Sequence, residues 1–113
     1  MWTPNEDRFI AERVIPYLRS QGFTDLRHER RGVDLKPYGA DHRAYVIEVK
    51  LDACPSCIKS VIGHLYYERL FGDRSPRARH CMAIPAEVLL DDLMLVQIEA
   101  LERDLDIGTL LIP

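Results

Sequence analysis

The segment AYVIEVKL, residues 44–51, limits most strongly how this chain can fold, because it predicts a buried strand that also carries charge. Most of its residues are apolar, yet Glu48 and Lys50 stand two positions apart. Side chains two apart in a strand point to the same side of a sheet, so this acid and this base should project together. Burying charged groups is costly unless they meet partners or a ligand. The fold must therefore bring other polar groups to this strand.

The rest of the chain predicts helices and strands that alternate. A capping sequence, TPNE at 3–6, starts a helix that Gly22 ends, and Pro16 should kink that helix. The elements expected after it are strands at 24–30, 32–37 and 43–51, a helix from 54 to 72, a strand at 80–85, a helix at 86–105 and a strand at 107–112. The first three strands predict an antiparallel meander, and the later alternation predicts parallel crossovers. We therefore expect an α/β fold with a mixed sheet and helices on both faces.

Length and composition favour one globular domain spanning residues 1–113. With 47% hydrophobic residues, a chain of 113 residues can bury a core without disulfide support. The formal net charge of −3 argues against a strongly basic nucleic-acid binder but allows a local basic surface. Charged residues interrupt positions 1–20, where a secretory signal needs an apolar stretch, and no apolar run is long enough to span a membrane. Together with an odd count of three cysteines, this predicts a cytoplasmic protein.

Asp34, Glu48 and Lys50 form the candidate catalytic group. Asp34 lies on the expected strand before Glu48, with 13 residues between them. A hairpin of that length can place the two carboxylates side by side, and paired carboxylates suit a hard divalent cation such as Mg²⁺. The ion supplies Lewis acidity and nucleophile activation, while a neighbouring lysine can orient water or stabilise charge on a phosphate.

These motifs resemble the PD-(D/E)XK nuclease superfamily, which has the restriction-endonuclease-like fold. GVD at 32–34, followed after 13 residues by EVK at 48–50, resembles the family's signature. The expected α-β-β-β-α-β order matches the family's core, to which a C-terminal helix and strand are added. The segment SVIGHLYYERLFGD at 60–73 resembles the helix after the signature strand, although His64 stands where glutamine is common and Val33 where proline is common. The resemblance covers roughly residues 5–85.

The resemblance implies a Mg²⁺-dependent nuclease that hydrolyses phosphodiester bonds in DNA, with Mn²⁺ able to substitute. It implies that Asp34 and Glu48 bind the metal and that Lys50 positions or activates the water. Many members use a glutamate of the first helix as well. Glu6 is favoured here because its phase matches the core-facing side of that helix, and Glu12 is the alternative. The resemblance to restriction enzymes and resolvases also implies a homodimer.

Two other interpretations of the same residues stay open. The domain could be a catalytically inactive nuclease-fold module that binds nucleic acid or protein. Alternatively, Asp34 could be an ordinary turn residue and Glu48 and Lys50 an exposed pair on an edge strand.

Basic residues near the candidate site are candidates for nucleic-acid contacts. Arg30 and Arg31 precede the Asp34 strand, and His64 lies on the helix after Lys50. Cationic side chains so placed can bind phosphates, or they can form an ordinary solvated surface.

Cys54 and Cys57 form a CxxC motif that allows three interpretations. The pair could be half of a zinc site completed by Cys81, His80 or His64. It could be a redox pair at a helix N-terminus, where thiol pKa values fall. It could also be two ordinary reduced cysteines.

Overall fold

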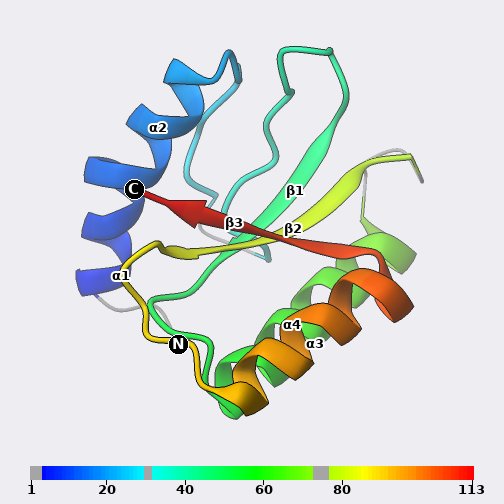
Figure 1. Ribbon diagram of the computed structural model, residues 1–113. Coiled ribbons are helices and arrows are strands. Elements are labelled where there is room, and N and C mark those ends of the chain that lie inside the picture. Colours follow the sequence, from blue (N-terminus) through cyan, green and yellow to red (C-terminus); the bar gives the residue numbers. More distant parts are fainter. Residues whose placement is uncertain (1–3, 30–31, 73–76) are drawn as a thin grey trace.

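The chain is built around a three-stranded parallel sheet, seen in a computed structural model that describes residues 4–29, 32–72 and 77–113 (Figure 1). An N-terminal helical run precedes the first strand, and strands and helices then alternate to the C-terminus. The elements are α1 (Pro4–Phe9), the π-helical η1 (Ile10–Val14), α2 (Ile15–Ser20), β1 (Tyr45–Val49), α3 (Pro55–Phe71), β2 (Arg79–Pro85), α4 (Asp92–Leu105) and β3 (Ile107–Ile112). The molecule is thus an α/β domain, as the sequence predicts.

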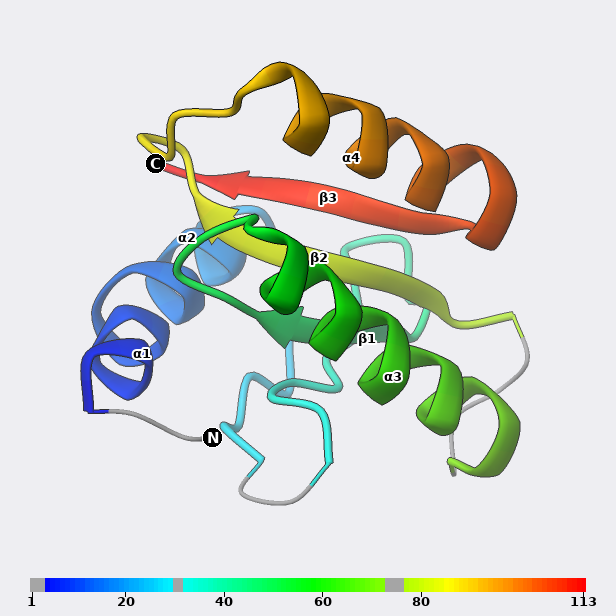
Figure 2. The same ribbon diagram turned by 90° about the horizontal axis from the view of Figure 1, so that it is seen from below.

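The sheet has the strand order β1-β2-β3 and separates two helical layers. The run α1–η1–α2 covers one face, and α3 and α4 lie together on the other (Figure 2). The alternation of side chains along β2 explains this division, since Cys81 and Ala83 pack toward the N-terminal helices and Met82 and Ile84 toward α3 and α4. The prediction of helices on both faces is confirmed.

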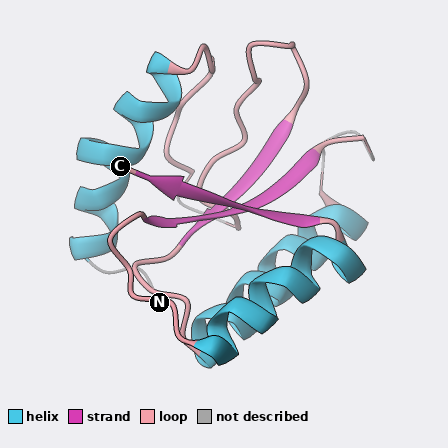
Figure 3. Cartoon of the chain, in the orientation of Figure 1, coloured by secondary structure: helices cyan, strands magenta, loops and turns pink. Residues whose placement is uncertain are grey.

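The predicted antiparallel meander is wrong as a set of regular strands. The segments 24–29 and 32–37 are loops (Figure 3), and their antiparallel pairing is reduced to isolated bridges. All strands of the regular sheet run parallel, so the expected mixed sheet is not formed. Pro37 has no N–H to give to a ladder, and Gly32 adopts a φ of +74° that extended strands do not use. These residues break the pairing into single contacts.

One of those bridges joins Leu35 to Ile47 and positions the candidate site. Leu35 N donates to Ile47 O at 3.0 Å, and Ile47 N donates to Leu35 O at 2.8 Å. Both side chains are fully buried, so the contact is anchored in the core. Asp34 directly precedes Leu35, and Glu48 directly follows Ile47. The bridge therefore holds both acids near the end of β1.

Two helix boundaries carry a physical explanation. Pro16 lacks an N–H and its ring crowds the preceding turn, and the helix accommodates it by the π-helical η1 directly before Ile15. The helix expected from residue 86 begins only at Asp92, because the Asp91 side chain caps it by accepting a hydrogen bond from Met94 N at 2.8 Å. Among the described residues, no helix has the length and apolar character needed to cross a membrane.

Candidate active site

Asp34 and Glu48 come together at the carboxyl end of β1. The Asp34 Oδ2 atom accepts a hydrogen bond from the Val49 N–H at 2.8 Å, which ties the carboxylate to the backbone next to Glu48. The negative charge of Asp34 also acts on the carboxyl group of Glu48, so the two acids interact. The structure therefore places side by side the two carboxyl groups that the sequence predicts as a metal-binding pair.

Glu48 is almost completely buried, and this changes its acidity. Its side chain is on the sheet face that α3 covers, and the residue is 2% exposed. Burial, followed by the negative charge of Asp34, raises the pKa of Glu48 to about 9, although the charge of Lys50 acts in the opposite direction. In the absence of a cation, the Glu48 carboxyl group therefore keeps its proton at neutral pH.

His64, on α3, is the second partner of Glu48. Its Nδ1 atom lies against the Glu48 Oε2 atom. Burial, followed by the charge of Lys50, lowers the pKa of His64, so the imidazole is neutral at pH 7. A neutral imidazole accepts a hydrogen bond from a protonated carboxyl group, which agrees with the raised pKa of Glu48. Among the described residues, the His64 side chain contacts Glu48, and the nucleic-acid contact expected from the sequence stays a prediction.

Lys50 lies one residue beyond the end of β1. Its N–H donates to Ala83 O at 2.9 Å and so extends the pairing with β2 by one residue. The strand geometry thereby continues to Lys50 and keeps its side chain on the same side as Glu48. The positive charge of Lys50 opposes the burial that raises the pKa of Glu48 and Glu6, and it adds to the burial that lowers the pKa of His64, so its ammonium group acts on all three.

The structure distinguishes the two candidate glutamates of the first helix. Glu6 is half-buried, and burial followed by the charge of Asp34 raises its pKa, so the two carboxyl groups interact. Glu12 instead forms an exposed pair with Arg8 at 3.1 Å. Glu6 is thus the first-helix acid that belongs to the Asp34–Glu48 group.

Sequence reasoning missed two residues of the site, Asp7 and His28. His28 Nδ1 lies 2.9 Å from Asp7 Oδ1, and His28 Nε2 lies 3.5 Å from Asp34 Oδ1. The imidazole therefore links α1 to Asp34. In the sequence, His28 sits in the charged stretch TDLRHER, and neither periodicity nor spacing relates it to Asp7, which is 21 positions earlier.

The remaining candidate residues lie elsewhere. Arg30 and Arg31 fall outside the described residues, so their role stays a prediction. Cys54 and Cys57 open α3, whereas Cys81 is buried in the core beneath the N-terminal helices. Within the described parts of the chain, no group of three or more His, Cys, Asp or Glu side chains could hold a metal ion. The zinc site completed by Cys81, His80 or His64 is therefore wrong.

A site made of two carboxylates still fits Mg²⁺. This ion keeps several of its waters and is commonly bound through only one or two protein carboxylates. Glu48 keeps its proton at neutral pH because it is buried beside the charge of Asp34, as its raised pKa indicates. A divalent cation can replace that proton and allow both groups to ionise. The chemistry of the pair therefore suits a hard cation.

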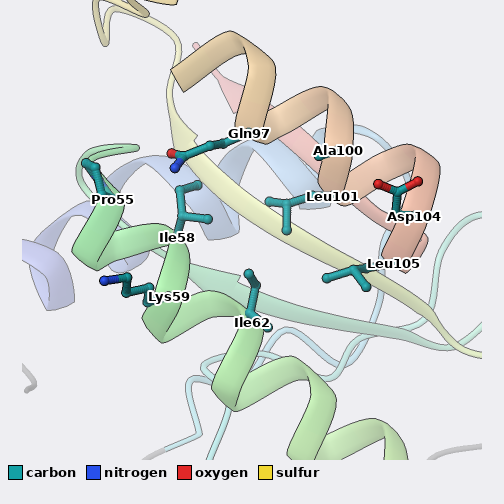
Figure 4. A pocket seen from close by; sticks show the side chains of 9 residues that line it. All are labelled: Pro55, Ile58, Lys59, Ile62, Gln97, Ala100, Leu101, Asp104 and Leu105. Carbon is teal, nitrogen blue, oxygen red and sulfur yellow. The ribbon is translucent and has the colours of Figure 1, made fainter. Parts of the chain in front are cut away.

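The hollow between α3 and α4 is separate from this group. It has a volume of about 350 Å³ and is lined mainly by apolar side chains that extend from Pro55 and Ile58 to Leu101 and Leu105 (Figure 4). Neither carboxyl group of the site lines it. The candidate active site is therefore a cluster of polar side chains at the end of β1 and not the apolar groove.

Glu48→Gln is expected to stabilise the cation-free protein. Because the pKa of Glu48 is about 9 in the fold and near 4.5 without it, the folded state binds more protons between these values and loses stability as pH rises through them. The substitution removes this loss, which reaches up to about 3 kcal/mol at pH 7. Urea unfolding from about pH 4 to about pH 9 should show the gain in the free energy of unfolding growing with pH.

The surface change Glu12→Gln serves as the control for this measurement. Glu12 is exposed and pairs with Arg8 on the surface of the helix, so its replacement should leave the pH dependence of stability unchanged. A Glu48→Gln protein that is less stable than the wild type at every pH would contradict the interpretation of Glu48 as a protonated, buried acid.

Comparison of this chain with protein-family models, curated proteins and solved structures found no match. The geometry of the cluster is therefore the basis for a functional conclusion.

Proposed function

We propose that this chain is a divalent-cation-dependent nuclease of the PD-(D/E)XK type that hydrolyses phosphodiester bonds in DNA. The observation that carries the proposal is the contact between the carboxyl groups of Asp34 and Glu48, with Lys50 next to them at the end of β1. This is the same residue combination that the sequence resemblance selects. The restriction-endonuclease-like fold is part of the proposal, and the α/β order from β1 onward is compatible with it.

The residues of the cluster have separate roles in the proposed reaction. Asp34 and Glu48 would hold Mg²⁺ or Mn²⁺, which when bound supplies Lewis acidity at the scissile phosphate. Lys50 presents a positive charge that can orient the attacking water and stabilise the negative charge that develops on the phosphate. Glu6 has a raised pKa and interacts with both Asp34 and Lys50, so it can accept a proton from that water.

His64 provides a place for the proton that Glu48 releases. Glu48 has to ionise when it becomes a metal ligand, and the neutral Nδ1 atom of His64 already lies against its Oε2 atom. About half of the His64 side chain is exposed, at 51%, so the ring can pass the proton on to solvent. In this scheme His64 is a positioning residue that acts through Glu48.

A cleavage assay tests the function directly. The purified chain would be incubated with supercoiled, linear, nicked, single-stranded and branched DNA in Mg²⁺ or Mn²⁺, with a chelator as the control. Cleavage that depends on the cation supports the proposal. If the chain binds DNA without cutting any substrate, it is the inactive nuclease-fold module. If it neither binds nor cuts DNA, the nucleic-acid part of the proposal is also wrong.

We further propose that the nuclease acts as a homodimer, because exposed apolar side chains lie along one side of α4. Leu89, just before the helix, is 91% exposed, and Leu93 and Val96 are 56% and 62% exposed. Leu93 and Val96 are three residues apart in α4, which puts them on one helix face, and Leu89 lies in the segment before that helix. A second copy of the chain supplies the same apolar surface, so a two-fold contact can cover both. Such a dimer would also enlarge the surface available to a DNA duplex.

The variant Leu93→Lys with Val96→Lys is expected to convert this dimer into a monomer. Burying two lysines from each chain without partners costs several kcal/mol, so the dissociation constant should rise by about 10³-fold or more. Light scattering after size-exclusion chromatography gives the mass. Glu12→Lys, an exposed charge change on the N-terminal helical run, which covers the opposite face of the sheet, should leave the dimer intact. A wild-type chain that is monomeric at every accessible concentration would refute the homodimer.

A further inference from the structure

The two cysteines at the start of α3 are arranged as a reactive pair. Cys54 is the N-cap residue of the helix, with extended backbone angles, and Pro55 occupies the first helical position. One turn later, the sulfur of Cys57 lies 2.7 Å from that of Cys54. Both residues are free thiols and half-buried, so neither is sealed in the core. The third cysteine, Cys81, is buried on the opposite face of the sheet.

We propose that Cys54 and Cys57 form a redox-active dithiol that exchanges with low-molecular-weight disulfides. The two sulfur atoms already face each other across one helical turn, so a bond between them requires little movement of the backbone. Here the CxxC motif opens the helix of a β-α-β unit, with four residues between it and β1, and a CxxC motif near such a unit is typical of thiol–disulfide exchange. This activity is separate from the proposed nuclease and does not depend on it.

The surroundings give the two thiols different chemical roles. A hydrogen bond from the Cys57 thiol, followed by a contact with Ser56 Oγ at 3.3 Å, lowers the pKa of Cys54. Burial, by contrast, raises the pKa of Cys57 to about 11. A thiolate at Cys54 also lies at a helix N-terminus, where the backbone N–H groups favour negative charge. Cys54 is therefore the attacking thiol and Cys57 the resolving one.

The exchange balances with a disulfide of a small thiol, such as glutathione disulfide, as the oxidant. The Cys54 thiolate attacks one sulfur of the disulfide, forms a mixed disulfide and releases one glutathione thiolate, which takes up a proton. Cys57 then loses its proton to solvent, and its thiolate attacks the Cys54 sulfur and releases the second glutathione. Two electrons pass from the protein to the oxidant, and the protein gains the Cys54–Cys57 disulfide.

The apolar groove between α3 and α4 starts beside this pair. Pro55, which stands between the two cysteines in the sequence, forms one end of the groove, and Lys59 lies one turn further along α3 (Figure 4). A disulfide that reaches Cys54 thus has an open surface and a cationic side chain next to it, and glutathione carries carboxylates that match such a charge.

Mass spectrometry of the native chain treated with glutathione disulfide tests this inference. The wild type and the control Cys81→Ser should each lose two hydrogen atoms and show a peptide linked through Cys54 and Cys57. Cys57→Ser should stop at a mixed disulfide on Cys54, because no resolving thiol remains. Cys54→Ser should react about tenfold more slowly than Cys57→Ser, because at neutral pH the larger thiolate fraction of Cys54 outweighs its lower intrinsic reactivity.

Other outcomes would overturn the inference. A wild type that stays fully reduced, or that carries one glutathione on each cysteine without a link between them, has no reactive dithiol. Equal rates for Cys54→Ser and Cys57→Ser would refute the assigned roles. Circular dichroism of each variant establishes that it is folded, and the wild-type result stands without any variant. The readout is a mass, so it is independent of whether the chain cleaves DNA.

Discussion

Asp34→Asn is expected to abolish cation-dependent DNA cleavage, with a fall in rate on the order of 10³-fold, which corresponds to about 4 kcal/mol of lost transition-state stabilisation. Asp34 lies beside Glu48, and the two carboxyl groups together provide the oxygen ligands and charge that a divalent cation needs. An amide at this position leaves a single acid in the pair. Calorimetry should therefore show weak or no binding of Mn²⁺ in parallel with the loss of cleavage.

The amide variant separates chemistry from folding. The oxygen of the introduced amide can still accept the hydrogen bond from the Val49 N–H, so the loop should remain attached to β1. Loss of the charge next to Glu48 also removes one cause of its raised pKa, which should make the cation-free protein no less stable. Asp104→Asn, at an exposed residue of α4 that pairs with its neighbour Arg103, is the matched control. Cleavage within tenfold of the wild-type rate would rule out Asp34 as a metal ligand.

The parts of the fold that the sequence predicts well are those in which local and tertiary preferences agree. The strand expected at 107–112 coincides with β3, because a short apolar run follows directly after Asp106, which ends α4 in a left-handed conformation with a φ of 52°. The helix opened by CPSC begins at Pro55 because proline suits the first helical position. In both cases one or two residues determine the boundary locally.

The strands expected between residues 24 and 37 were predicted wrongly, because the formation of a regular strand there depends on contacts with residues distant in the sequence. The bridge from Leu35 to Ile47 forms because both side chains are buried in the core, and it pairs in the antiparallel direction that the sequence suggests. Neighbouring positions carry charge, glycine or proline, so no ladder extends from it. One buried pair was enough to bring Asp34 to Glu48, which is why the two acids could be predicted although the strand expected to carry Asp34 is not formed.

Histidines complete the site through tertiary packing, which the sequence pattern does not encode. His28 contacts Asp7 across the gap between a loop and α1, and His64 contacts Glu48 across the gap between α3 and the sheet. The sequence of α3 contains apolar residues such as Leu65 that are buried, but it does not show which strand residue a polar side chain meets. A histidine close to a predicted acid pair in three dimensions is recognisable only from coordinates.

Lys50→Met should reduce cleavage by about 10²–10³-fold while cation binding persists. The ammonium group lies beyond the carboxyl pair and acts on Glu48, Glu6 and His64 through its charge. Methionine keeps most of the side-chain volume but cannot orient water or stabilise charge on the phosphate. Asp34→Asn should lose both Mn²⁺ binding and cleavage, whereas Lys50→Met should keep Mn²⁺ binding and lose cleavage. The two measurements together therefore distinguish Lys50 from Asp34.

The matched control for that comparison is Lys59→Met, which removes the same charge from an exposed position of α3 outside the acid cluster. A general loss of DNA affinity would affect both lysine variants and would be relieved by lower salt, whereas a loss of catalysis would be confined to Lys50 and would not respond to salt. Lys50→Arg keeps the charge but broadens it over a planar group, so it should recover only part of the rate. If Lys50→Met cleaves DNA as fast as the wild type, the lysine is a structural counter-ion for the buried acids, and the proposed mechanism loses its water-positioning residue.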